Sequence, residues 1–304
     1  MADACQCNLG FENTGVPNCQ PIAQVAKKLI VVPLYANDGT RNQIDLTATL
    51  DAAYFSALIN NTDSTKRFYP LPLIDNVEDV RADSITETLN SGQEIFVQKG
   101  TRTFTGVLVR QSSVFYSKID NLRCFEFGIF VVDKSGNIIG SIDADDATKL
   151  NPIQVDQNTW NPILVKTTDT TVQKVQINFA WSSVEEDGNL RIIEASEIDT
   201  NALNLSGLLD VNSVISAIST TGFTNTMTLD YGSAVNKIAV EGWVASDFSL
   251  YNNTTAAAVV ITSTTESSAG VYDFIIPAQT SADNLTLSGQ KDGYEMPDVS
   301  FDIP

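Results

Sequence analysis

The sequence contains no histidine, which removes the commonest general base and the commonest metal ligand of proteins. This argues strongly against hydrolase triads and histidine-containing zinc sites, although carboxylates, lysines and cysteines remain. Long apolar runs are also missing: no stretch approaches the roughly 18–20 residues that a membrane helix needs. The first seven residues, Met-Ala-Asp-Ala-Cys-Gln-Cys, have neither a basic segment nor an apolar core, so we expect no signal peptide.

Positive charge is scarce. Lys and Arg total 18 against 37 Asp and Glu, which gives a net charge of −19. Residues 1–200 hold 16 cations and 26 anions, a net −10, whereas residues 201–304 hold 2 cations and 11 anions, a net −9. A surface this acidic repels phosphates, because nucleic-acid binding needs clustered Lys or Arg. The more one-sided charge of the last third favours a domain boundary near residue 200.

Cysteine is rare, and three of the four cysteines lie near the N-terminus, at Cys5, Cys7 and Cys19, with the fourth at Cys124. These four could ligate one metal ion. Their spacing contains no CxxC pair, so reduced thiols on an N-terminal arm are the favoured interpretation. We therefore expect no metal site and no cofactor.

Other patterns that carry chemistry are absent or weak. No phosphate loop, GxSxG, HExxH, EF-hand or GxGxxG motif occurs. The cluster at Asp143, Asp145 and Asp146 lacks the glycine and the bidentate glutamate of a calcium loop, and the acidic run at 185–189 is typical of a solvated hairpin tip. We expect no catalytic residue, and the chain is interpreted as a structural protein rather than an enzyme.

What the sequence does contain is β-strand patterning. Val175, Ile177, Phe179 and Trp181 alternate with polar residues and predict a strand over 172–181 with one buried face. Two apolar runs, 124–132 and 138–142, flank a Gly-containing turn and predict a hairpin, and further strands are expected at 29–35, 84–89, 94–98, 103–109, 160–167 and 190–198. Helical spacing predicts short helices over 50–60 and 113–121. Residues 62–80, which contain two prolines, are expected to form a long loop.

The last 84 residues change in style, with short Thr- and Ser-rich strands at regular spacing that are typical of a small immunoglobulin-like (Ig-like) β-sandwich. The predicted organisation is an N-terminal arm over 1–20, a β domain over 21–200, a linker over 201–220 and an Ig-like sandwich over 221–304. A short helix at 211–218 is considered within the linker.

Two groups of segments carry a family resemblance. Residues 94–98 with the following Lys-Gly-Thr-Arg-Thr-Phe, and the hairpin over 125–140, resemble the major tail protein of tailed bacteriophages, the subunit of the tail tube. Residues 251–255, 269–276 and 285–294 resemble the later strands of Ig-like domains that such proteins carry outside the tube.

The resemblance implies a mostly β fold: a tail-tube-like β-sandwich or barrel with one or two short helices, followed by a small Ig-like β-sandwich. It also implies hexameric rings stacked into a hollow cylinder in the virion. The partners would be copies of the chain itself and other virion proteins, with DNA passing through without specific binding and no membrane involved. No catalytic residues are carried over.

The residues suggest how such rings could form. We expect the long apolar strands over 125–132 and 172–181 to be open edges that pair between subunits, with acidic faces lining the bore. The arm over 1–20 or the loop over 62–80 would bridge to the next ring.

The alternatives to a tail-tube subunit are a capsid decoration or head-fibre protein, a carbohydrate- or receptor-binding module with Trp243 and Tyr251 as a platform, and an enzyme that uses paired carboxylates. The aromatics Phe125, Phe127 and Phe130 are assigned to core and interface packing.

Overall fold

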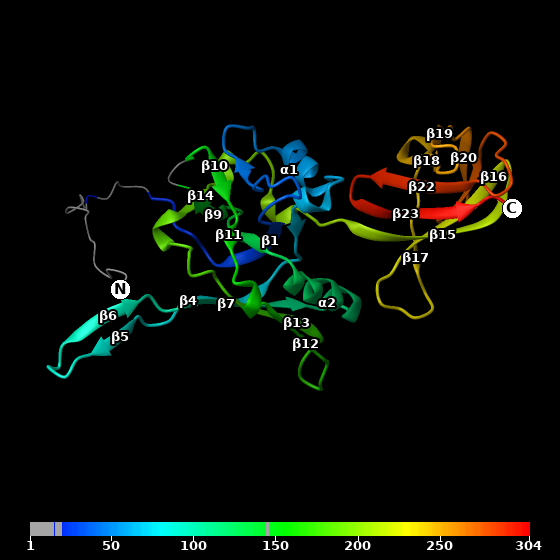
Figure 1. Ribbon diagram of the computed structural model, residues 1–304. Coiled ribbons are helices and arrows are strands. Elements are labelled where there is room, and N and C mark those ends of the chain that lie inside the picture. Colours follow the sequence, from blue (N-terminus) through cyan, green and yellow to red (C-terminus); the bar gives the residue numbers. More distant parts are fainter. Residues whose placement is uncertain (1–14, 16–19, 144–145) are drawn as a thin grey trace. The chain divides into compact units, whose positions relative to one another are not determined.

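The computed structural model describes residues 15, 20–143 and 146–304 (Figure 1). As predicted, this part of the chain is mostly β-strand, with two short α-helices, α1 (Ala52–Ile59) and α2 (Ser113–Asp120). Residues of the expected N-terminal arm, apart from 15 and 20, lie outside the described residues, as do Cys5, Cys7 and Cys19.

The chain forms two compact units. The first contains the described residues up to Ala52, together with Pro70–Arg110 and Ile119–Leu205. The second contains Ala53–Tyr69, Gln111–Lys118 and Ser206–Pro304, so both helices belong mainly to the second unit.

The larger sheet of the first unit is centred on β8, in which every residue is buried. The strand order is β2-β10-β9-β8-β1-β3, with β11 also paired to β8 and β14 to β9. The predicted hairpin around the turn at 133–137 is confirmed as β8 and β9, and the predicted strand near 29–35 is β1. The bounds are β1 (Ala26–Pro33), β2 (Ile44–Asp45), β3 (Tyr69–Pro70), β8 (Phe127–Asp133), β9 (Ile138–Ile142), β10 (Lys149–Asn151), β11 (Ile153–Gln154) and β14 (Leu190–Ile193).

The smaller sheet of the first unit has four strands in the order β12-β13-β7-β4. The alternation predicted over 172–181 is confirmed, because Val175, Ile177 and Phe179 are buried in β13 while the residues between them are partly exposed. A separate hairpin, β5 and β6, follows β4 in the chain, and both of its strands were predicted. The bounds are β4 (Asp75–Arg81), β5 (Ile85–Thr88), β6 (Glu94–Gln98), β7 (Arg102–Val109), β12 (Asn161–Val165) and β13 (Lys174–Ala180).

An aromatic cluster joins the two sheets of the first unit. The ring of Trp160 meets the edge of Phe127 from the larger sheet at 5.1 Å and packs against Phe179 from the smaller sheet at 5.4 Å. Phe104 stacks on Phe179 at 5.0 Å, and the indole N–H of Trp160 donates to the carbonyl of Ile119 at 2.9 Å. Each such buried side chain contributes about 1.5–3 kcal/mol through removal of apolar surface from water.

Of the expectations for residues 50–80, the loop is corrected and the helix is confirmed. The predicted loop over 62–80 is largely ordered and packed: Phe68 and Ile74 are buried, and β4 occupies its last part. The predicted helix over 50–60 does form as α1, which buries Phe55 and Ile59. Leu50, just before it, is buried as well, and Tyr54 and Leu58 are half-buried.

The second unit is a two-layered sandwich whose layers are joined by β15. Leu209 and Asp210 at the start of β15 pair in parallel with β23 of one layer, and the rest of β15 pairs with β16 of the other. The expected linker and short helix over 211–218 are therefore wrong, because these residues are an integral strand. The bounds are β15 (Leu209–Ser219), β16 (Gly222–Leu229), β17 (Ile238–Ala239), β18 (Phe248–Asn252), β19 (Ala257–Val259), β20 (Ser263–Ser268), β21 (Val271–Ile275), β22 (Asn284–Lys291) and β23 (Tyr294–Asp302).

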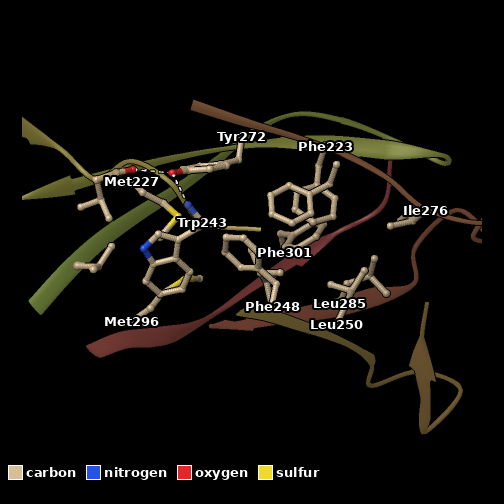
Figure 2. Close-up of a cluster of buried hydrophobic side chains, with 14 of the residues drawn as sticks. Phe223, Met227, Trp243, Phe248, Leu250, Tyr272, Ile276, Leu285, Met296 and Phe301 are labelled. Atoms are coloured by element: carbon tan, nitrogen blue, oxygen red, sulfur yellow. Dashed lines mark hydrogen bonds between the residues drawn. The ribbon is translucent and has the colours of Figure 1, made fainter. Parts of the chain in front are cut away.

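Large side chains from both layers fill the core of this sandwich, as Figure 2 shows. The rings of Phe223 and Phe274 stack at 4.7 Å, and Trp243 packs against Phe248 at 5.1 Å. Short 3-10 turns complete the chain at η1 (Ser64–Lys66), η2 (Asn121–Cys124), η3 (Gln157–Thr159), η4 (Asp187–Asn189), η5 (Ala195–Glu197), η6 (Ala202–Asn204) and η7 (Ala245–Asp247).

Candidate assembly surface

The β5–β6 hairpin, here called the arm (residues 82–99), stands clear of the rest of its unit (Figure 1). Among the described residues its two strands pair only with each other, and every residue from 78 to 99 is exposed. Nevertheless it carries five large apolar side chains that are 39–50% exposed, namely Ile85, Leu89, Ile95, Phe96 and Val97. Exposed apolar side chains that gather on one element are typical of a surface that binds another protein.

Charged side chains hold the base of the arm. Arg81 makes two hydrogen bonds to the carboxylate of Asp187, at 3.0 and 2.8 Å, and a third to the carbonyl of Gly100 at 2.8 Å. Lys99 pairs with Glu186 of the same acidic turn. The hydrogen bond from Arg81 holds the pKa of Asp187 below its ordinary value. The acidic run at 185–189 is largely exposed, as expected of a solvated turn, and it also pairs with Arg81 and Lys99 at the base of the arm.

A second group of side chains lies beside this base. Arg102 makes two hydrogen bonds to Asp79, at 2.7 and 2.6 Å, and its guanidinium lies 5.2 Å from the centre of the Trp181 ring. The indole N–H of Trp181 also donates to Asp79, at 3.1 Å. Bidentate Arg–carboxylate pairs impose a fixed geometry, so the direction in which the arm leaves the sheet is set by these contacts.

Gly100 is required where the arm closes. A side-chain carbon at this position would lie 2.1 Å from the carbonyl oxygen of Ala82 and 2.4 Å from that of Asp83. The two backbones at the base of the arm therefore approach each other more closely than any other residue would permit.

The smaller sheet beneath the arm has two open edges. Within the described residues, β4 pairs only with β7, and β12 pairs only with β13. Pro162 in β12 is typical of an edge strand, because proline has no N–H to give to a second neighbour. The strands expected to be edges, 125–132 and 172–181, are interior instead: β8 lies between β1 and β9, and β13 lies between β12 and β7. That expectation was wrong.

The face of the smaller sheet turned away from the core mixes polar side chains with exposed apolar ones, among them Val80, Val109 and Ile163. On the interior strands β7 and β13 it presents Thr103, Thr105, Gln176 and Asn178, with Lys174 at one end. Glu78 of β4 is opposite Thr105. This composition differs from the acidic face expected from the net charge.

The other residues singled out from the sequence do not form a site. Cys124 is an exposed free thiol. Asp145 lies outside the described residues, and Asp146 accepts a hydrogen bond from the hydroxyl of Thr148. No group of three or more possible metal ligands occurs in the part of the chain that the structure describes.

The aromatic residues singled out from the sequence do not form a binding platform. Trp243 is 4% exposed and lies in the sandwich core, so it offers no platform to a sugar, although Tyr251 is 44% exposed. Phe127 and Phe130 are buried as expected, and Phe125 is exposed.

The second unit has a polar pocket of about 580 Å³ beside β18 and β22. Two pairs of its charged side chains neutralise each other, Arg67 with Glu295 at 2.5 Å and Lys291 with Asp247 at 3.4 Å, while Asp292 and Asp298 also line it. The lining thus has four carboxylates against two cations, and both cations are already paired. Neither α-helix has the length and apolar character needed to span a bilayer, and the described residues contain no other helix that does.

No family model matches the chain, and no curated protein matches it. One solved structure similar to part of it is the N-terminal part of the bacterial S-layer protein SbsC, with 23% identity and a TM-score of 0.22, covering 31% of this chain and 22% of that chain. Another is the Escherichia coli adhesin FdeC, with 11% identity and a TM-score of 0.24, covering 93% of this chain and 95% of that chain. Both likenesses are too slight to carry an argument.

Proposed function

We propose that this chain is a structural subunit of a virion tail tube, which assembles into rings, hexameric as the family resemblance implies, that stack into a DNA-conducting channel. The observation that carries the proposal is the exposed arm. A two-stranded hairpin by itself is marginally stable in water, and this one keeps five large apolar side chains in contact with solvent. A second subunit that covered the arm would remove this apolar surface from water, and the same contact would stabilise the hairpin.

Lateral association is supported by the open edges of the smaller sheet. β4 and β12 lie at opposite edges of this sheet, so a contact between copies would join the β4 edge of one subunit to the β12 edge of the next. Each added subunit then offers a free edge to a further subunit. Such an arrangement ends only when the ring closes, and closure leaves no edge unpaired. In this proposal the sheets of successive subunits form one continuous wall.

The outward face of the smaller sheet would then line the bore. Its interior strands present hydroxyl, amide and valine side chains. Their cations are Lys174 and Arg102, and Arg102 is paired with Asp79. Strong binding to DNA requires several Lys or Arg at phosphate spacing, so DNA would pass this wall without being held. Transit without specific binding thus rests on the shortage of cations rather than on an acidic lining.

Electron microscopy of the purified full-length chain, before and after incubation at high concentration, tests the proposal. Stacked rings with a central channel are expected. Trimeric fibres would instead favour the head-fibre alternative, and a chain that stays monomeric at every concentration would overturn assembly altogether.

The role of the arm is tested by replacing Ile95 and Val97 with serine. The expected result is loss of tubes with a nearly unchanged thermal unfolding midpoint, because these side chains are 42% and 48% exposed and lie outside the buried core. The matched control replaces Val235 and Val260, which are 86% and 72% exposed on the second unit, and should assemble normally. Tubes formed by the arm variant at the concentration that suffices for the control would refute the role of the arm.

A further inference from the structure

Apart from Lys99 at its base, the arm carries negative charge only. Between its basal residues Arg81 and Lys99 lie Asp83, Glu87 and Glu94, with no Lys or Arg among them. None of these three carboxylates forms an ion pair with any residue in the described ranges. Glu87 lies directly opposite Ile95 in the hairpin, so one face of the arm combines a carboxylate with apolar side chains.

The far end of the same sheet carries positive charge. Lys174 begins β13 opposite Val109 and Val165, Lys166 directly follows β12, and Arg110 directly follows β7 with its backbone N–H bonded to the carbonyl of residue 173 at 2.9 Å. Arg110, Lys166 and Lys174 are here called the cationic rim. Nothing among the described residues pairs with these three cations, whereas Arg81, Lys99 and Arg102 near the arm are all paired.

The rim also exposes apolar surface and holds little opposing charge. Val109 is 36% exposed and Val172 is 49% exposed. Asp169 is the one acidic residue between 163 and 174, so the rim has an excess of two positive charges, three cations against one anion.

The arm and the rim lie at opposite ends of one rigid sheet. The arm leaves the sheet where Arg81 pairs with Arg102 at the start of β7, and the rim lies where Val109 pairs with Lys174 at the end of β7. Figure 1 shows the hairpin and the β12–β13 turn at opposite ends of these strands. A single copy therefore cannot bring its own arm to its own rim.

We propose that the arm of one subunit docks on the cationic rim of a second copy of this chain in the adjacent ring, with Asp83, Glu87 and Glu94 facing Arg110, Lys166 and Lys174. This inference rests on the proposed function and identifies its axial contact. Arm and rim differ in charge as well as in shape, so every copy is added in one orientation. Opposite charges steer association and accelerate it, and salt screens them. Ring stacking is thus directional and sensitive to ionic strength, while the apolar side chains hold the contact once it has formed.

Zero-length carbodiimide cross-linking of the full-length chain tests the contact directly, because it joins a carboxylate to a lysine only when the two touch. A mixture of ¹⁴N- and ¹⁵N-labelled copies distinguishes links between chains from links within one chain. Mass spectrometry should find intermolecular links from Glu87 or Glu94 to Lys166 or Lys174. Intermolecular links from the arm to Lys134, an exposed lysine in the β8–β9 turn, with none to the rim would overturn the inference.

Charge reversal gives the second test. Glu87→Lys and Lys166→Glu should each slow tube elongation about tenfold at low salt, which is the lower end of the range for electrostatic steering. The controls Glu241→Lys and Lys134→Glu change the net charge equally and should elongate at the wild-type rate. The double variant Glu87→Lys with Lys166→Glu should recover most of the lost rate.

The outcomes separate the two proposals. Single reversals that elongate at the rates of their controls, or a double variant with no recovery, would overturn the arm–rim contact while wild-type tubes still support the proposed function. A wild-type chain that gives neither tubes nor intermolecular cross-links would overturn both.

Discussion

The hydroxyl of Tyr272 is the most informative single group in the sandwich of the second unit. It is fully buried, donates a hydrogen bond to the carbonyl of Val240 at 2.8 Å and accepts one from the backbone N–H of Trp243 at 3.2 Å, as Figure 2 shows. Burial raises the pKa of Tyr272, so the hydroxyl keeps its proton and can donate at neutral pH. The two bonds tie the segment between β17 and β18 to β21, across a connection that contains no other strand.

Tyr272→Phe removes this oxygen and leaves a buried carbonyl and a buried N–H without their partner. A buried polar group left unpaired costs about 1–3 kcal/mol. For two such groups, with partial relaxation, we expect a loss of about 2–4 kcal/mol, a large share of the 5–15 kcal/mol that stabilises a typical domain. The matched control is Tyr251→Phe, which removes the same oxygen from a side chain that is 44% exposed and should change the stability by less than about 0.5 kcal/mol.

Native-state hydrogen exchange, read peptide by peptide, measures this loss within the full chain. Amides of β16 and β21 should exchange faster in Tyr272→Phe by the factor that corresponds to the lost free energy, while amides of β8 in the first unit keep their rates. A loss below about 1 kcal/mol, or one equal to that of Tyr251→Phe, would refute the reasoning, because it would mean that the two backbone groups find new partners without cost.

Three further predictions concern the first unit. Gly100→Ala places a carbon 2.1 Å from the carbonyl oxygen of Ala82, so we expect a loss of about 1–3 kcal/mol in chemical denaturation and slower tube formation. The pKa of Asp187 is lowered by its bond to Arg81, so the stabilisation is present above about pH 4 and is lost as the pH falls through the folded-state pKa. Since Asp187 is half exposed, the effect stays below about 1 kcal/mol. The protection factors of the arm amides, which give the exchange rate of an unstructured chain relative to theirs at the same pH, should fall in acid while those of β8 do not. A chain that ends at Leu205 should be soluble and assemble, whereas one that ends after β15 should aggregate, because β15 would lose both neighbouring strands.

Several elements could be predicted from the sequence because their patterns are local. The alternation of Val175, Ile177 and Phe179 required a strand with one buried face, and the structure has it in β13. The hairpin of β8 and β9 was visible from two apolar runs around the turn that ends at Gly136, which adopts a φ of 89°. Both signals, the alternation and the turn, arise from residues that are neighbours in the sequence, so they do not depend on how the rest of the chain folds.

The strand β15 shows why another prediction failed. Val211, Val214, Ile215 and Ile218 follow helical spacing, yet these residues form a strand with a bulge between 216 and 219, where Ala217 has a φ of 48°. The bulge shifts the alternation by one residue, so a bent strand imitates the spacing of a helix. Pairing with β16 and β23, which lie later in the chain, decided the outcome.

For the candidate assembly surface, too, some features could be predicted from the sequence and others could not. The sequence alone determined that the chain is mostly β, lacks histidine chemistry, is strongly acidic and contains a hairpin over 84–98, because composition and two-residue periodicity are properties of the chain itself. Only the tertiary structure decided which strands are edges, that the acidic turn at 185–189 receives Arg81 and Lys99, and that the arm stands free at the end of the sheet opposite Lys174. The physical reason is that exposure and pairing are set by long-range contacts: a strand becomes an edge when no later segment hydrogen-bonds to it, and no local pattern records that.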